Sequence, residues 1–127
     1  RLTELYRGEL RDGVRVQDAY AMVVVALPTP AVSASATDPV GRSLRMARIG
    51  DEARTVFPTA ESIGRIGQRR VVVLTRRDER LGRRVALLRS MLNAAEDGPA
   101  GPPLRIWIEG LPTNDGGAGH LLDELAR

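Results

Sequence analysis

The clearest hydrophobic pattern in the chain is an uninterrupted apolar run from Tyr20 to Leu27, which includes Val23, Val24 and Val25 in succession. Its length and its β-branched residues predict a strand that is buried on both faces in the centre of a sheet. Pro28-Thr29-Pro30 follows at once and ends the strand, because proline cannot donate a ladder hydrogen bond.

Two more apolar segments, residues 62–66 and 70–75, are separated only by Gly67-Gln68-Arg69. A short connection that contains glycine is typical of a hairpin between antiparallel strands. Residues 104–108 alternate around Trp107 and predict one further strand.

Apolar residues at helical spacing predict helices over about residues 2–14, 38–57, 78–94 and 120–126. The clearest stripe is that of residues 78–94, formed by Leu81, Val85, Leu88 and Leu92. Residues 113–119 are polar and glycine-rich, and predict a loop.

The helix over residues 38–57 has a start signal, with Asp38 as N-cap and Pro39 in the first helical position. Its buried face is expected to contain four apolar residues, Val40, Leu44, Ala47 and Val56. Arg48-Ile49-Gly50-Asp51-Glu52 is expected inside or at the end of this helix, since no strand-like run follows it.

The elements alternate as helix, strand, helix, hairpin, helix, strand and helix. This order predicts the α/β (α+β) class, with a ferredoxin-like or palm-like mixed β-sheet, a central hairpin and helices packed on the sheet. No internal repeat or second domain is visible, so residues 1–127 are predicted to form a single domain. Because the chain starts with Arg1 instead of Met, we expect it to be a fragment of a larger protein.

Composition narrows the function classes. Cysteine is absent, which excludes disulfides and thiol chemistry and favours the cytoplasm. No apolar run approaches the roughly 20 residues of a membrane-spanning helix. The formal net charge is +3 and every basic residue is an arginine. The guanidinium fork suits phosphate, but so small a net charge favours nucleic acid only weakly.

No familiar catalytic constellation is present. His120 is the only histidine, and no acid–base or nucleophile constellation surrounds it in the sequence. Asn114-Asp115-Gly116-Gly117 lacks the remaining ligands of a calcium loop. No zinc pattern, P-loop, nucleophile elbow or dinucleotide fingerprint occurs.

Several segments, taken in order, carry a resemblance to a known family. Residues 2–7 are similar to an opening Leu-Thr-Gly-Leu-x-Asn-Arg motif, and residues 62–74 are similar to a strand-turn-strand that carries Arg-Leu-Gly-Gly-Asp-Glu-Phe. Met22 to Leu27, Leu104 to Leu111 and Leu121-Leu122 fall where that family has its first strand, a late strand and its final helix. On these motifs the chain resembles the GGDEF family of diguanylate cyclase domains, which implies a role in cyclic di-GMP signal transduction.

The signature hairpin departs from the family at the positions that carry its chemistry. Gly67 matches the first glycine, Gln68 replaces the second, and Arg69 and Arg70 replace the two acidic residues. The family has a metal-binding acid at the end of the first strand, where this chain has Ala26-Leu27-Pro28. In place of the family's inhibitory Arg-x-x-Asp the chain has Pro58 and Glu61, so the arginine of that motif is missing.

These departures decide which chemistry the resemblance implies. Magnesium prefers carboxylate and other oxygen ligands, and an arginine offers no lone pair. Two unit charges about 4 Å apart interact by about 4 kcal/mol at an effective dielectric constant of about 20, so an arginine would also repel the ion. We therefore expect no enzyme activity, no catalytic residues, no metal and no cofactor.

The resulting expectation is a degenerate, catalytically inactive GGDEF-like regulatory domain. Its partners would be neighbouring domains of the parent protein, another protein or a second copy in a homodimer. The alternative is a non-catalytic receptor for cyclic di-GMP or GTP, with Arg65, Arg69 and Arg70 as candidate phosphate-binding residues, although solvated arginines at a hairpin tip explain the same pattern. RNA binding on a ferredoxin-like sheet is less expected, because aromatic residues make up only 3% of the chain.

Overall fold

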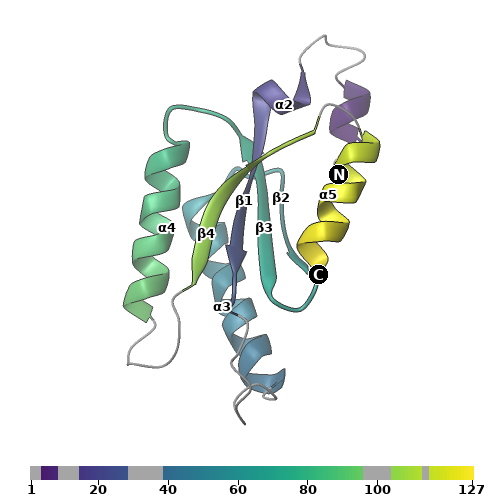
Figure 1. Cartoon of the computed structure of the whole chain (residues 1–127). Helices are drawn as coiled ribbons and strands as arrows, with labels where there is room; N and C mark the ends of the chain where they lie inside the picture. Colours follow the sequence, from purple (N-terminus) through teal and green to yellow (C-terminus); the bar gives the residue numbers. More distant parts are fainter. Residues whose placement is uncertain (1–3, 9–14, 29–38, 96–103, 113–114) are drawn as a thin grey trace.

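The computed structural model describes residues 4–8, 15–28, 39–95, 104–112 and 115–127 (Figure 1). Residues 4–8 are helical. The elements that follow are α2 (Val16–Ala19), β1 (Tyr20–Ala26), α3 (Pro39–Val56), β2 (Ser62–Ile66), β3 (Arg70–Arg76), α4 (Leu81–Ala95), β4 (Arg105–Gly110) and α5 (Asp115–Ala126).

The four strands form one sheet in the order β2-β3-β1-β4. Each of the three neighbouring pairs is antiparallel. The strands β1 and β2, joined through α3, therefore run parallel with β3 between them. The strands β3 and β4, joined through α4, also run parallel to each other, and β1 lies between them. This double split crossover is the ferredoxin-like arrangement, and the predicted α+β class is confirmed.

The predicted mixed pairing needs a correction, because no described strand has a parallel neighbour. The two helical crossovers do join parallel strands, as such connections require. Each crossover skips one position in the sheet, however, and the skipped position is filled by an antiparallel strand. The predicted hairpin between residues 62–66 and 70–75 is confirmed by the β2–β3 register, in which Ile66 is paired with Arg70.

One face of the sheet packs against α3 and α4. Alternate residues of the central strands, among them Val23, Val25 and Val73, are fully buried there. The stripe predicted for α4 is confirmed, since Leu81, Val85, Leu88 and Leu92 all belong to this core cluster. Burial of β1 on both faces explains why its sequence shows no alternation.

The opposite face packs against α5 and the helical residues 4–8, which lie beside α5 in Figure 1. Met22, Val24 and Val72 contribute the sheet side of this second core cluster. The hydroxyl of Tyr6 donates a hydrogen bond of 2.6 Å to the carbonyl oxygen of Pro112, just beyond β4. The sheet therefore lies between two helical layers.

The buried face predicted for α3 was wrong for most of its members. Val40 and Leu44 are each 68% exposed, and Ala47 is exposed as well. Of the predicted set only Val56 is buried. The residues that are buried are spaced by three and four positions and lie on a different face of the helix: Met46, Ile49, Ala53 and Val56.

Other predicted boundaries also differ from the structure. Residues 115–119 belong to α5 and not to a loop, so that helix begins five residues before His120. The four-residue α2 was not predicted. The Gly50-Asp51-Glu52 segment lies within α3, as expected. Asp38, the rest of the helix predicted over 2–14, and Thr113-Asn114 lie outside the described residues.

Within the described ranges, no helix combines the length and the apolar character needed to span a membrane.

Candidate functional site

The candidate site is the tip of the β2–β3 hairpin, at Gly67-Gln68-Arg69. Gly67 has a φ angle of 63°, which lies in the left-handed region. Residues other than glycine adopt that region at a cost, except Asn and Asp, which tolerate it best. The sequence signal of a short glycine-containing link therefore has a direct cause in the geometry of the turn.

The C-terminal end of α5 contacts this turn at Gly67. A Cβ atom at position 67 would collide with the backbone of Ala126, whose carbonyl carbon would lie 2.9 Å away. Glycine is therefore required here for close approach as well as for its φ angle. One side of the Gly67 backbone is therefore in contact with the chain's own last helix, while Gly67 and Gln68 remain exposed on the other side.

Arg70 fastens α5 to the hairpin. Its Nη1 donates hydrogen bonds to the carbonyl oxygens of Leu125 at 2.6 Å and Glu124 at 3.3 Å. The last carbonyl groups of a helix have no partner within the helix, and the helix dipole makes this end partly negative. A cationic side chain at position 70 satisfies both requirements, whereas a carboxylate would be repelled.

Arg69 connects the same turn to the end of β1. Its Nη1 donates a hydrogen bond of 3.3 Å to the carbonyl oxygen of Pro28. In return, the backbone N–H of Leu27 donates to the carbonyl oxygen of Arg69 at 2.7 Å. The stretch Leu27-Pro28 at the end of β1 therefore lies against the turn, and the contact is made through the main chain and a guanidinium group.

Arg65 lies on the other face of the sheet. In the strand register it is paired with Val71, which faces α3 and α4, whereas Ile66 and Arg70 face α5. Its guanidinium donates to the Oγ and the carbonyl oxygen of Ser43 in α3, at 3.5 and 3.3 Å. The structure thus brings Arg69 and Arg70 together at the tip and separates Arg65 from them.

A cavity of about 180 Å³ lies at the tip, lined by residues of the turn and of the chain end, among them Arg69, Arg70 and Arg127. Its positive charge is partly offset by the carbonyl oxygens of α5 that Arg70 contacts. In the described part of the chain, no group of three or more acidic or histidine side chains is placed to hold a metal ion.

Comparison with known proteins gives no identification: no family model, no curated protein and no solved structure matches the chain. The GGDEF resemblance therefore remains a hypothesis carried by the motifs and their order.

The structure contains a second cavity that the sequence analysis did not predict. It lies between α3 and β2, has a volume of about 170 Å³, and includes Gly50, Arg54, Gly64 and Arg65 in its lining. One signal pointed toward it, since an isolated glycine within a helix costs about 1 kcal/mol relative to alanine and leaves space beside the helix. Gly50 is such a glycine.

Proposed function

We propose that this chain is a catalytically inactive, GGDEF-like signalling domain that works as a regulatory or protein-interaction module. The observation that carries the proposal is the position of Arg69 and Arg70 at the signature turn, where both donate to main-chain carbonyl groups of this chain. A diguanylate cyclase would need that turn to be open to a nucleotide and flanked by carboxylates. Here Ala126 contacts one side of the turn, and Arg69 and Arg70 flank it.

The same contacts give the hairpin a structural role, because they connect it to other elements of the fold. Arg70 holds α5, and Arg69 holds the end of β1, so the tip links these two parts of the chain to the hairpin. A junction of this kind can pass a displacement of α5 to the sheet, because packed elements move as units and deform little. This supports regulation through contact with a partner in place of chemistry at the turn.

The alternative, a receptor for cyclic di-GMP or GTP that uses Arg65, Arg69 and Arg70 together, has weaker support. The three guanidinium groups each donate to an acceptor within the chain, and Arg65 donates on the opposite face of the sheet. A phosphate group at the tip would have to displace the α5 carbonyl groups from Arg70.

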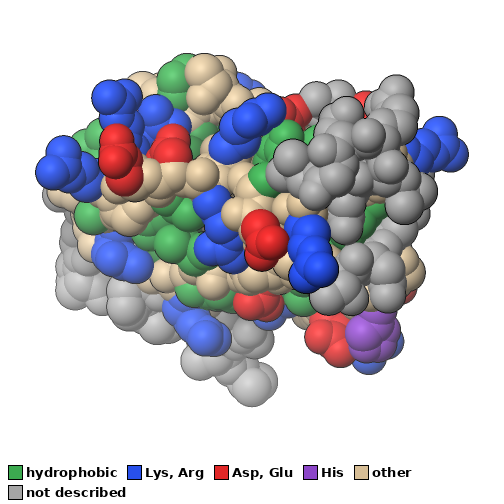
Figure 2. Space-filling model, turned by 90° about the horizontal axis from the view of Figure 1, so that it is seen from above, with side chains coloured by type: hydrophobic (Ala, Val, Ile, Leu, Met, Phe, Trp, Pro, Cys, Tyr) green, Lys and Arg blue, Asp and Glu red, His purple; other side chains and the backbone are tan. Residues whose placement is uncertain are grey.

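RNA binding on the sheet also has weak support. Such binding uses an exposed sheet surface with aromatic side chains for base stacking. In this structure α3 and α4 cover one face, while α5 and residues 4–8 cover the other. Where Figure 2 draws described residues, basic and acidic side chains are interspersed and form no continuous basic surface.

The proposal is tested by incubation of the purified protein with GTP and Mg²⁺, followed by chromatographic analysis of the products. We expect no cyclic di-GMP, even at protein concentrations of tens of micromolar. The variant Arg69→Asp/Arg70→Glu restores the family's charges at the turn and is also expected to be inactive, because Ala26-Leu27-Pro28 at the end of β1 still offers no carboxylate for a metal ion. Formation of cyclic di-GMP by the wild-type chain would refute the proposal.

Calorimetry distinguishes the nucleotide receptor from the regulatory module. Titration of GTP and of cyclic di-GMP into the wild-type chain is expected to give no heat that depends on the hairpin tip. Binding that is present in the wild type and lost in Arg69→Gln would favour the receptor.

A further inference from the structure

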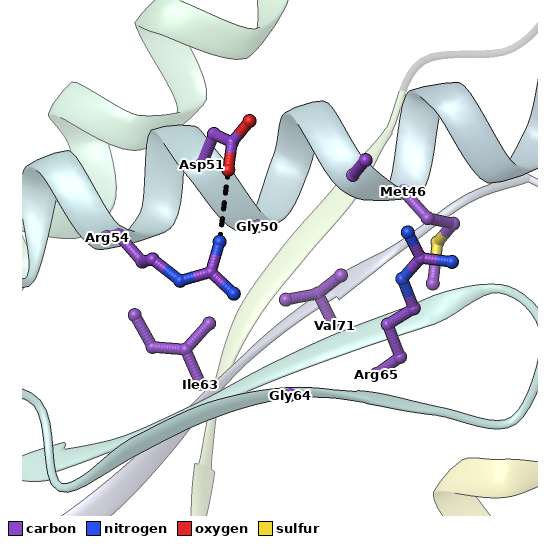
Figure 3. A pocket seen from close by; sticks show the side chains of 9 residues that line it. Met46, Gly50, Asp51, Arg54, Ile63, Gly64, Arg65 and Val71 are labelled. Carbon is purple, nitrogen blue, oxygen red and sulfur yellow. Dashed lines mark hydrogen bonds and ion pairs between the residues drawn. The ribbon is translucent and has the colours of Figure 1, made fainter.

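The cavity between α3 and β2 is a slot whose walls are glycine backbone (Figure 3). Gly50 of α3 lies opposite Gly64 of β2, with no side chain from either to fill the space between helix and strand. Gly50 is buried, and a Cβ atom there would contact only the Arg54 guanidinium, at 3.5 and 4.0 Å from its two terminal nitrogens. The Arg54 guanidinium therefore lies beside Gly50, in the direction that a side chain at position 50 would take.

The floor of the slot is apolar. Met46 from α3 and Ile63 and Val71 from the sheet line it, and Met46 and Val71 belong to the buried core. A volume of about 170 Å³ is enough for one ring, since a cavity of about 150 Å³ takes up benzene. It is too small to enclose a ligand made of two nucleotides.

Two guanidinium groups stand at opposite ends of the opening. Figure 3 shows Arg54 extending from α3 at one end and Arg65 rising from β2 at the other. Arg54 is held by Asp51 through an ion pair of 3.0 Å. Among the described residues, Arg65 makes longer contacts, at 3.3 and 3.5 Å, with Ser43. These pairings are solvent-exposed, so an anionic ligand can exchange with them at small cost.

From this arrangement we infer that the slot binds a mononucleotide-sized anion, with a flat ring on the apolar floor between Arg54 and Arg65, beside Gly64, and a phosphate group on Arg65. Peptide planes and an apolar floor suit a flat ring, while guanidinium groups suit phosphate through paired N–H donors. The exposed carboxylate of Asp51 at the rim accepts hydrogen bonds from N–H groups of a base. The site is independent of the hairpin tip and of the function proposed for it.

The test is isothermal titration calorimetry of the whole chain with AMP, GMP, CMP and UMP as probes. Inorganic phosphate and the four nucleosides form two separate arms. We expect at least one nucleotide to bind more tightly than either of its parts alone. No heat from any nucleotide would overturn the inference, and so would phosphate alone binding as tightly as the nucleotides.

Variants locate the binding. Arg65→Gln removes the phosphate anchor and is expected to weaken binding about tenfold or more. Arg83→Gln, on the exposed surface of α4, is its control and leaves the affinity unchanged. An affinity that does not change in Arg65→Gln would refute the assignment.

Substitutions of Gly50 by side chains of increasing size test whether the ligand occupies the slot. Gly50→Ala is expected to reduce the affinity and to raise Tm, because alanine is the better helix former. Gly50→Leu is expected to abolish binding. The controls Gly119→Ala and Gly119→Leu change an α5 glycine around which a Cβ atom meets nothing within 4 Å, and they keep the affinity. Affinity that survives in Gly50→Leu would place the ligand elsewhere, while the proposal for the hairpin tip would stand unaffected.

Discussion

Arg70 in β3 and Leu125 in α5 are joined by a hydrogen bond of 2.6 Å from a guanidinium nitrogen to a main-chain carbonyl oxygen, across 55 positions of sequence. This bond turns the hairpin's basic tip into a cap for the C-terminal end of a helix. It also explains why a positive charge is compatible with a place that, in the family the chain resembles, carries an acidic residue.

Removal of the Arg70 side chain should loosen α5. For Arg70→Ala we expect the free energy of unfolding to fall by about 1–2 kcal/mol, because partly buried carbonyl groups lose a charged donor. Urea denaturation measures the loss, and hydrogen exchange should accelerate in the last turn of α5. Arg83→Ala on the exposed face of α4 is the control, and an equal loss in both variants would show that Arg70 has no special role.

Substitution of Gly67 should be costly for two separable reasons. Gly67→Ala is expected to lower the free energy of unfolding by about 2 kcal/mol or more, from the positive φ angle and the collision with Ala126. Gly67→Asn tolerates the φ angle but keeps the collision, so it should remain clearly destabilising. Gly64→Ala, where a Cβ atom meets nothing within 4 Å, should be neutral or stabilising. Thermal melts of the three variants give the ranking, and a fully stable Gly67→Asn would show that α5 does not press on the turn.

The buried stripe of α3 can be checked with one pair of variants. Ile49 is 2% exposed and Leu44 is 68% exposed. Ile49→Ala should cost about 2–5 kcal/mol, because it removes buried methyl groups and leaves a cavity. Leu44→Ala should change the free energy of unfolding by less than about 0.5 kcal/mol. If chemical denaturation showed a larger loss of stability for Leu44→Ala than for Ile49→Ala, the buried face of α3 would be the one expected from the sequence.

The hydroxyl of Tyr6 ties residues 4–8 to the end of β4. Tyr6→Phe keeps the buried ring and removes only the donor to Pro112. The expected loss is about 1 kcal/mol, the usual net value of one hydrogen bond. Chemical denaturation measures it, with Tyr20→Phe as the control. No loss in Tyr6→Phe would mean that this bond adds nothing to the attachment.

Local patterns predicted much of the fold. The apolar run of β1 identified the central strand, because a strand buried on both faces needs no polar alternation. The glycine-containing link identified the β2–β3 hairpin, and the leucine stripe of α4 identified its buried face. Each of these signals depends on residues that are neighbours in the chain, so the physics that sets them is visible in the sequence.

The buried face of α3 could not be predicted in the same way. Val40 and Leu44 are as apolar as the residues that are buried, and helical spacing permits more than one face. Which face is covered depends on where the sheet lies relative to the helix, and that is a contact between distant segments. The length of α5 was also hidden, because glycines at its start resemble a loop until packing of Ala118 and Leu125 stabilises the helix.

For the candidate site, the sequence by itself determined that arginines replace acidic residues at positions 69 and 70. It also determined that Gly67 allows a turn. Only the tertiary structure decided what those arginines contact, which face Arg65 occupies, and that Gly50 and Gly64 border one slot. The physical reason is that charge and backbone freedom belong to single residues, whereas contacts and cavities exist only where segments far apart in the chain are packed against one another.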